Sequence, residues 1–434
     1  MSAFPRYQRY KDSGVEWLGE VPAHWEVNVL RACAELSTER NRSDLPVLSV
    51  YREYGVILKD SRDDNHNATS LDTSNYKVVH PGDLAVNKMK AWQGSLGVSE
   101  YLGIVSPAYI TCKINQSKVN GRYLHYLLRS KPLIGALDAI SYGVRVGQWD
   151  MRCEDFKQVR LTYPPKPEQD RIVTFLDQKT AEIDALIAKK QRQIELLDEQ
   201  KAILINRAVI RGLNPAAPLK DSGIPWIGLI PKHWELKRVK HCALYFTSGS
   251  RGWGDYYADS GDAFLQSGDL TDNCTISLDN VKRVRLPKRT EGLRTRLESH
   301  DTVVCITGAN TGRVANVGEV HETIFVNQHL CLVRPSRTIN TQYLSLALSG
   351  SAGRTHFTLS QYGLKEGLNL DDVKNCLFPL PPIDEQAEVL AHIQTLSKAL
   401  EAAAAKVESQ NQALQTLRST LIAHAVTGKI AVTE

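Results

Sequence analysis

Two sixteen-residue stretches of the 434-residue chain repeat each other: KDSGVEWLGEVPAHWE at residues 11–26 and KDSGIPWIGLIPKHWE at residues 220–235. A second matching pair follows, PPKPEQDRIVTFL from Pro164 and PPIDEQAEVLAHI from Pro381. The first pair is 209 positions apart and the second pair 217, so both ends of a unit recur in order while the segment between them differs in length. The sequence therefore predicts two similar halves, as expected for a chain too long for one hydrophobic core.

The second pair of stretches marks the start of a long helix in each half. Proline is tolerated in a first helical turn and acidic residues favour its positive end, while Gly212 and Gly428 are typical C-caps. Apolar residues recur every seven positions, which predicts a coiled-coil seam between antiparallel helices; helices docked on separate domains are the alternative. The expected seam residues are Leu176, Ile183, Leu197, Leu204, Ile393, Leu400, Val407, Leu414 and Leu421.

The segments between the repeats, residues 27–163 and 236–380, are typical of α+β modules. DTVVCI, TIFV and LCLV predict short buried strands, and GRYLHYLLRS and TQYLSLALSG predict one helix in each module. The predicted fold is α+β: two similar α/β domains joined by two long antiparallel helices, with a pseudo-two-fold internal repeat. The expected domains are a first domain with its lead (1–163), a central helix (164–213), a second domain with its lead (214–380) and a C-terminal helix (381–434).

The composition is that of an ordinary globular protein, with 42% hydrophobic and 23% charged residues. No apolar run approaches 18 residues, and the first residues lack the apolar region of a secretory signal, so we expect a cytoplasmic protein. The eight cysteines are scattered singly, which predicts buried reduced thiols and no metal site.

The excess positive charge lies in the two modules. Basic and acidic residues are equal in number over residues 168–211 and over residues 385–429 of the predicted helices, whereas residues 27–163 carry a net charge of +4 and residues 236–380 a net charge of +3. This distribution favours DNA as the partner of the modules. The densest cluster, VKRVRLPKRTEGLRTR, predicts phosphate contacts, although a solvated basic loop is the alternative. Its candidate residues are Lys282, Arg283, Arg285, Lys288 and Arg289.

Two matching loops carry further candidates. CITGANTGRVANVG, from Cys305, resembles a nucleotide-binding turn, but Val314 replaces the third glycine and no βαβ unit follows. Its counterpart, MKAWQGSLGVS, aligns Gly94 with Gly312 and changes the residues around it. Amide and cationic side chains suit base edges and phosphates, although exposed turns remain the alternative. The candidates are Lys88, Lys90, Trp92 and Gln93 in the first module, Asn310, Thr311 and Arg313 in the second, and Arg145, Arg251 and Lys365 in other turns.

The repeated Pro-His-Trp does not predict catalysis. No repeated serine, cysteine or carboxylate accompanies His24 and His233 in the sequence, so we expect a packed aromatic corner around Trp25 and Trp234. The chain also lacks a GxxxxGK[ST] loop for ATP and the Asn-Pro-Pro-Tyr or Asp-Pro-Pro-Tyr motif of amino-methyltransferases. We therefore expect no catalytic residues.

Over essentially its whole length the chain resembles the specificity subunit of type I restriction-modification systems. The resemblance rests on the order and duplication of the W-x-G-x-x-P-x-H-W leads at Trp17 and Trp226, the PP-x-x-EQ helix entries, and the AVIRGL and AVTGKI endings. It implies two target-recognition domains that each read half of a bipartite DNA site, two adenine-N6 methyltransferase subunits and two restriction subunits as partners. It also implies no cofactor in this chain, with S-adenosylmethionine, ATP and Mg on the partners. A nucleotide-dependent oxidoreductase built on TGANTG and a coiled-coil adaptor without DNA contacts are the alternatives.

Overall fold

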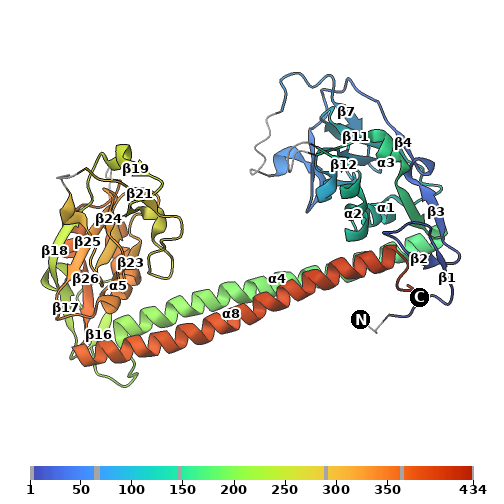
Figure 1. Ribbon diagram of the computed structural model, residues 1–434. Helices are drawn as coiled ribbons and strands as arrows, with labels where there is room; N and C mark the ends of the chain where they lie inside the picture. Colours follow the sequence, from blue (N-terminus) through green and yellow to red (C-terminus); the bar gives the residue numbers. More distant parts are fainter. Residues whose placement is uncertain (1–3, 63–68, 144–148, 288–291, 362–365, 433–434) are drawn as a thin grey trace. The chain divides into compact units, whose positions relative to one another are not determined.

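The computed structural model describes residues 4–62, 69–143, 149–287, 292–361 and 366–432. The chain divides into two compact units, the first from residues 1–191 and 408–434 and the second from residues 192–407. Both boundaries fall inside the two long helices, so each helix contributes one part to each unit (Figure 1).

The two long helices are α4 (Lys166–Arg211), with 46 residues, and α8 (Ile383–Val426), with 44. In the first unit Arg418 of α8 pairs with Asp184 of α4. In the second unit Lys201 of α4 pairs with Glu401 of α8. From Asp184 to Lys201 the chain moves forward along α4, while the partner on α8 moves back from Arg418 to Glu401. The paired parts of the helices therefore run antiparallel, as predicted (Figure 1).

Apolar residues pack between these helices in each unit. In the first unit Leu176, Ile183 and Leu421 belong to the main core, and Leu414 packs against it. In the second unit Ile393 belongs to the core, Val407 is buried, and the other proposed seam residues are half-buried; these are Leu197, Leu204 and Leu400.

The glycines that follow the helices adopt left-handed conformations, as expected of C-caps. Gly212 has φ 69° and Gly428 has φ 72°. The Gly212 N–H donates to the carbonyl of Ala208 over 3.0 Å, which satisfies one of the free carbonyls at the end of α4.

The first unit begins with a hairpin and is built around a four-stranded antiparallel sheet with strand order β4-β11-β8-β9. Helices α1 and α2 follow the sheet in sequence, and β14 returns to pair with β3 before α4 begins (Figure 1). The elements are β1 (Tyr10–Asp12), β2 (Glu20–Pro22), β3 (Glu26–Val29), β4 (Ala34–Leu36), β5 (Leu48–Tyr51), β6 (Gly55–Leu58), β7 (Lys77–Val79), β8 (Leu84–Asn87), β9 (Leu96–Val98), β10 (Gly103–Val105), β11 (Tyr109–Ile114), α1 (Gly121–Leu128), α2 (Lys131–Ala139), β12 (Ser141–Tyr142), β13 (Asp150–Met151), α3 (Cys153–Gln158) and β14 (Arg160–Tyr163).

The second unit repeats this plan with the sheet β18-β25-β22-β23, and it has a further four-stranded sheet, β19-β21-β20-β24, in which β20 and β24 are parallel. Strand β26 pairs with β17 before α8 begins. The elements are β15 (Leu219–Asp221), β16 (Leu229–Pro231), β17 (Glu235–Arg238), β18 (Ala243–Ser248), β19 (Tyr257–Ala258), β20 (Asp262–Leu265), β21 (Lys282–Val284), β22 (Thr302–Cys305), β23 (Val314–Asn316), β24 (Ile324–Val326), β25 (Leu330–Pro335), α5 (Thr341–Ser349), α6 (Ser351–Leu359), α7 (Leu370–Asn375) and β26 (Leu377–Leu380).

The α+β fold and the internal repeat are therefore confirmed, and the number of helices per module is corrected. We expected one helix in each module, but α1 and α5 are each followed by a second helix, α2 or α6, and then by a short one, α3 or α7. The helices are separated after Leu128 and Ser349, where Ser130 and Gly350 have extended backbones and act as N-caps of the next helix. The three predicted strands correspond to β22, β24 and β25.

Most of the cysteines are buried in the cores. All eight cysteines are free thiols, and burial raises the pKa of Cys112 to about 12 and that of Cys33 to about 11. These thiols therefore stay protonated near neutral pH. Among the helices in the described ranges, none is both long and apolar enough to cross a membrane.

Candidate nucleic-acid interface

The repeated His-Trp pairs clamp the start of the long helix in their own unit. In the first unit Glu168 of α4 lies 2.8 Å from Nε2 of His24 and accepts from Nε1 of Trp25 over 3.1 Å. Glu385 of α8 makes the same two contacts in the second unit, at 2.8 Å to His233 and 2.9 Å to Trp234. Both tryptophans are fully buried.

The expectation of a packed aromatic corner is thus confirmed, but the statement that no repeated carboxylate accompanies the histidines is wrong. Glu168 and Glu385 come from the PP-x-x-EQ entries, which are far from the leads in sequence and adjacent in the fold. Tyr7 donates a further hydrogen bond of 2.6 Å to Glu168. Burial, followed by this bond, holds the pKa of Tyr7 well above its ordinary value, so the phenol stays a donor.

A glutamine and a tyrosine make further contacts to the long helices in each unit. We call these contacts, together with those of the histidine, tryptophan and glutamate, the mount of a module. Gln169 accepts from the N–H of Asn120, the N-cap of α1, and Gln386 does the same for Asn340, the N-cap of α5. The hydroxyl of Tyr123 donates to the carbonyl of Val426 over 3.0 Å, and that of Tyr343 donates to Val209 over 2.9 Å. Each module is thereby fixed to the start of one long helix and to the end of the other.

Each module has a hairpin loop that carries part of the candidate residues. Strands β8 and β9 pair from Leu84↔Val98 to Val86↔Leu96, and β22 and β23 pair from Thr302↔Asn316 to Val304↔Val314. Gly94 and Gly312 have φ 88° and 86° at corresponding points of the two loops. A Cβ at Gly94 would also lie 2.8 Å from Cδ1 of Ile134, so this turn requires glycine.

The loop of the first module combines lysines with a pair of tryptophans. Nζ of Lys88 lies 2.9 Å from Oδ2 of Asp150, and Lys90 is exposed. The rings of Trp92 and Trp149 lie 4.8 Å apart, centroid to centroid, and Gln93, which follows Trp92, is half-buried. Trp149 was missed by the sequence reasoning because it lies among three extra residues that have no counterpart in the second module.

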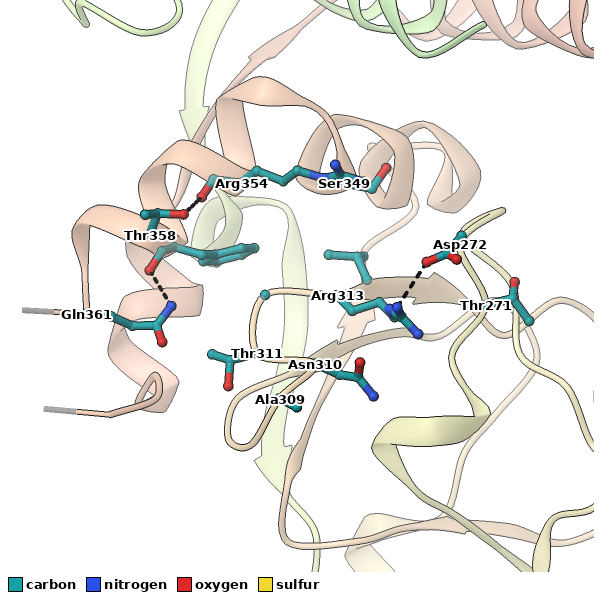
Figure 2. A pocket seen from close by; sticks show the side chains of 13 residues that line it. Thr271, Asp272, Ala309, Asn310, Thr311, Arg313, Ser349, Arg354, Thr358 and Gln361 are labelled. Carbon is teal, nitrogen blue, oxygen red and sulfur yellow. Dashed lines mark hydrogen bonds and ion pairs between the residues drawn. The ribbon is translucent and has the colours of Figure 1, made fainter. Parts of the chain in front are cut away.

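The loop of the second module lines a polar pocket of about 340 Å³, shown in Figure 2. Asn310 donates to the carbonyl of Ser267 over 3.1 Å, and Thr311 donates to that of Gly308 over 2.6 Å. Arg313 donates to the carbonyl of Leu270 and lies 3.0 Å from Oδ1 of Asp272.

Helix α6 contributes the other wall of this pocket. Arg354 and Thr358 lie on this helix and Gln361 follows it, and all three line the pocket opposite the loop (Figure 2). Arg354 is exposed and forms no ion pair with any residue in the described ranges. It was not predicted, because nothing in TQYLSLALSGSAGR indicates that this helix returns to the loop.

The basic cluster is less uniform than the sequence implied. Lys282 is exposed and Arg285 is exposed with a 2.7 Å hydrogen bond to Ser260, but Arg283 is paired with Glu322. That carboxylate raises the pKa of Arg283 and neutralises its charge locally. Arg251 is exposed at a turn beside Trp253, which is buried against Phe264 and Phe325. Four other candidates lie outside the described residues: Arg145, Lys288, Arg289 and Lys365.

The TGANTG segment has the wrong surroundings for a nucleotide-binding turn. It connects β22 to β23, which are adjacent antiparallel strands, whereas a dinucleotide-binding turn connects a strand to a helix whose N-terminus faces the phosphates. No cluster of three or more potential metal ligands occurs among the residues that the structure describes. The hairpin thus presents side chains at a loop tip rather than a phosphate cradle.

Comparison with known proteins agrees with this architecture. The type I restriction enzyme EcoBI specificity subunit of Escherichia coli is 23% identical over 81% of this chain and 74% of its own length. The MjaVIII specificity subunit of Methanocaldococcus jannaschii is 22% identical over 82% of this chain and 80% of its own length. A solved structure concerning assembly and conformational transition of the type I R-M system has a TM-score of 0.64 at 14% identity, covering 94% of this chain and 98% of that one, which shows a similar fold.

The family model for the type I restriction modification DNA specificity domain matches residues 74–196 and 294–408, one segment in each repeat. Each matched segment contains a hairpin loop with its two flanking strands, the helices that follow in sequence and the first part of a long helix. Because these segments cover more than half of the 434 residues, the chain belongs to the family of type I restriction-modification DNA specificity subunits.

Proposed function

We propose that this chain selects the DNA site of a type I restriction-modification complex, with each module reading one half of a bipartite sequence. The observation that carries the proposal is the contrast within the repeat. Both modules have the same mount, yet the loop of the first carries Lys90, Trp92 and Gln93, whereas the loop of the second carries Asn310, Thr311 and Arg313. Base edges are distinguished by such differences in side-chain chemistry.

The proposal assigns the chemistry to partner subunits. Two modification subunits would transfer methyl groups from S-adenosylmethionine to adenine N6, and two restriction subunits would use ATP and Mg. This division is supported by the relatives, which are specificity subunits, and by the missing ATP-binding and amino-methyltransferase motifs in this sequence. The chain itself would hold no cofactor and act in the cytoplasm, where the DNA and the partners are.

The test is an exchange of one module. Residues 27–163 are replaced by the corresponding module of another family member, the chain is expressed with modification subunits, and methylated adenines are mapped across the host genome. We expect one half of the recognised sequence to change and the other half to persist. The matched control replaces residues 236–380 and should change the opposite half; a change in both halves after either exchange contradicts independent reading.

A further inference from the structure

Two tryptophans of the first module, Trp92 and Trp149, pack against each other at the loop tip. Trp92 lies in the short 3₁₀ turn η3 (Ala91–Gln93), and Trp149 immediately precedes β13. Their ring planes are inclined by 55°, so one ring leans on the other rather than standing alone in solvent. Both side chains are half-buried, and Met89 beside them is 51% exposed.

The two segments that carry the rings are tied together by polar contacts. The N–H of Met151 donates to the carbonyl of Lys88 over 3.1 Å, and the Lys88 ammonium lies 2.9 Å from the Asp150 carboxylate. The ring pair therefore has two anchors besides its own contact. A partner that docks here meets a positioned surface and pays little ordering entropy.

The chemistry of Trp92 restricts what it can recognise. Its only polar atom, Nε1, already donates to the carbonyl of Met89 over 3.2 Å, so the rest of the indole offers carbon. Lys90 is exposed in the same loop, and the module carries net positive charge, which favours DNA as the occupant of this apolar surface. In the major groove, the thymine C5-methyl is the one apolar feature on a base edge.

We propose that Trp92, positioned by Trp149, reads thymine in the first half-site by van der Waals contact with its 5-methyl group. This inference rests on the proposed function. A half-site that contains a target adenine always has thymine on the opposite strand. The half-site therefore always contains a thymine methyl group that Trp92 could contact. The second module reads differently, because Asn310 stands where the first has Trp92, and its Trp253 is buried.

The test uses the intact complex of this chain with modification subunits and a duplex that contains the mapped target. Each thymine of the first half-site is replaced by deoxyuridine, which removes the methyl group and keeps the base pairing. We expect binding to weaken about four-fold for each contacted methyl, the effect of burying one methyl-sized group. The same replacement in the second half-site is the matched control, and there the Trp92→Ala variant should respond as the unsubstituted chain does.

Variants of Trp92 and Trp149 test whether Trp92 is the residue that contacts the thymine methyl group. Trp92→Ala should lower affinity for the thymine-containing first half-site. It should also abolish the sensitivity of binding to deoxyuridine, because removing the methyl group no longer removes a contact. Trp149→Ala should reduce that sensitivity, and Trp149→Phe should restore part of it. Preserved discrimination at the second half-site shows that the variants are folded.

Three results would overturn the inference, two of them from deoxyuridine substitution alone. One is an unsubstituted complex that discriminates first half-sites yet ignores every deoxyuridine in them; the other is undiminished deoxyuridine sensitivity in Trp92→Ala. Loss of affinity in Trp92→Ala without deoxyuridine sensitivity in the original complex would indicate a wedge between base pairs and would also refute methyl reading. A complex with no sequence preference at either half-site would instead refute the proposed function itself.

Discussion

The helix entries and the loop tips of this chain differ in how strictly the repeat is kept. At the entries, a histidine and a tryptophan hold the glutamate of the following long helix in both units, with contacts between 2.8 and 3.1 Å. At the tips, the left-handed glycine and one alanine (Ala91 and Ala309) recur, while Trp92 in one loop corresponds to Asn310 in the other. Stability requires the same contacts in each unit, whereas recognition of two different half-sites requires different side chains on the same support.

The largest effect should follow from removing the tryptophan of a mount. Trp25→Ala and Trp234→Ala each delete a fully buried indole and its hydrogen bond to the helix carboxylate. Each should lower the free energy of unfolding by about 3 to 5 kcal/mol, as truncation of large aromatic core residues does. Urea denaturation followed by circular dichroism measures the loss.

The matched control for this prediction is Trp92→Ala, which removes a half-buried indole at a loop tip and should cost about 1 kcal/mol or less. Equal losses at Trp25 and Trp92 would mean that the tips are as structural as the mounts. The comparison between mount and tip would then lose its physical basis.

The sequence predicted the scaffold better than the interface for a physical reason. Heptads, glycine caps and repeated leads are local patterns, so the two helices, their antiparallel pairing and the α+β modules could be predicted from them. The contact of Glu168 with His24 joins residues 144 positions apart, and nothing local indicates it. Arg354 was missed for the same reason, because only the tertiary fold brings α6 to the loop, and Trp149 was missed because its segment also has no counterpart in the second module.

The next largest effect should be a loss of base discrimination in the second half-site alone. Asn310→Ala and Arg354→Ala each remove a polar group from the pocket of the second module. Each should weaken discrimination within the second half-site about ten-fold, in line with about 1 to 3 kcal/mol for a good contact to a base, and leave the first half-site unaffected. Competition binding with singly substituted duplexes reads this out; a uniform loss across all sequences would instead make these residues phosphate contacts.

A smaller effect should distinguish Arg285 from Arg283 in the basic cluster. Arg285 is exposed, so Arg285→Ala should weaken binding to all sequences equally and reduce the slope of log affinity against log salt by about one. Arg283 is already paired with Glu322, so the double variant Arg283→Ala/Glu322→Ala keeps the net charge and should keep the slope. Fluorescence anisotropy over a salt series measures both, and a reduced slope in the double variant would show that Arg283 also reaches phosphate.

The smallest effect concerns the ion pairs between the long helices, which repeat in position but differ in chemistry. Arg418 contacts both oxygens of Asp184, at 2.8 and 3.1 Å, whereas Lys201 contacts one oxygen of Glu401 at 2.8 Å. Asp184 and Glu401 are 50% and 57% exposed, although Lys201 is only 19% exposed, so water and side-chain entropy offset much of the attraction in both pairs. Double-mutant cycles with alanine should give coupling energies of about 0.5 to 1 kcal/mol for the arginine pair and about 0.2 to 0.5 kcal/mol for the lysine pair, because a planar guanidinium loses less freedom per bond.

Both coupling energies should decline in 1 M salt, where charges are screened beyond about 3 Å. Coupling above about 2 kcal/mol in either cycle would mean that charge, rather than the apolar seam between the helices, holds that part of the pair together.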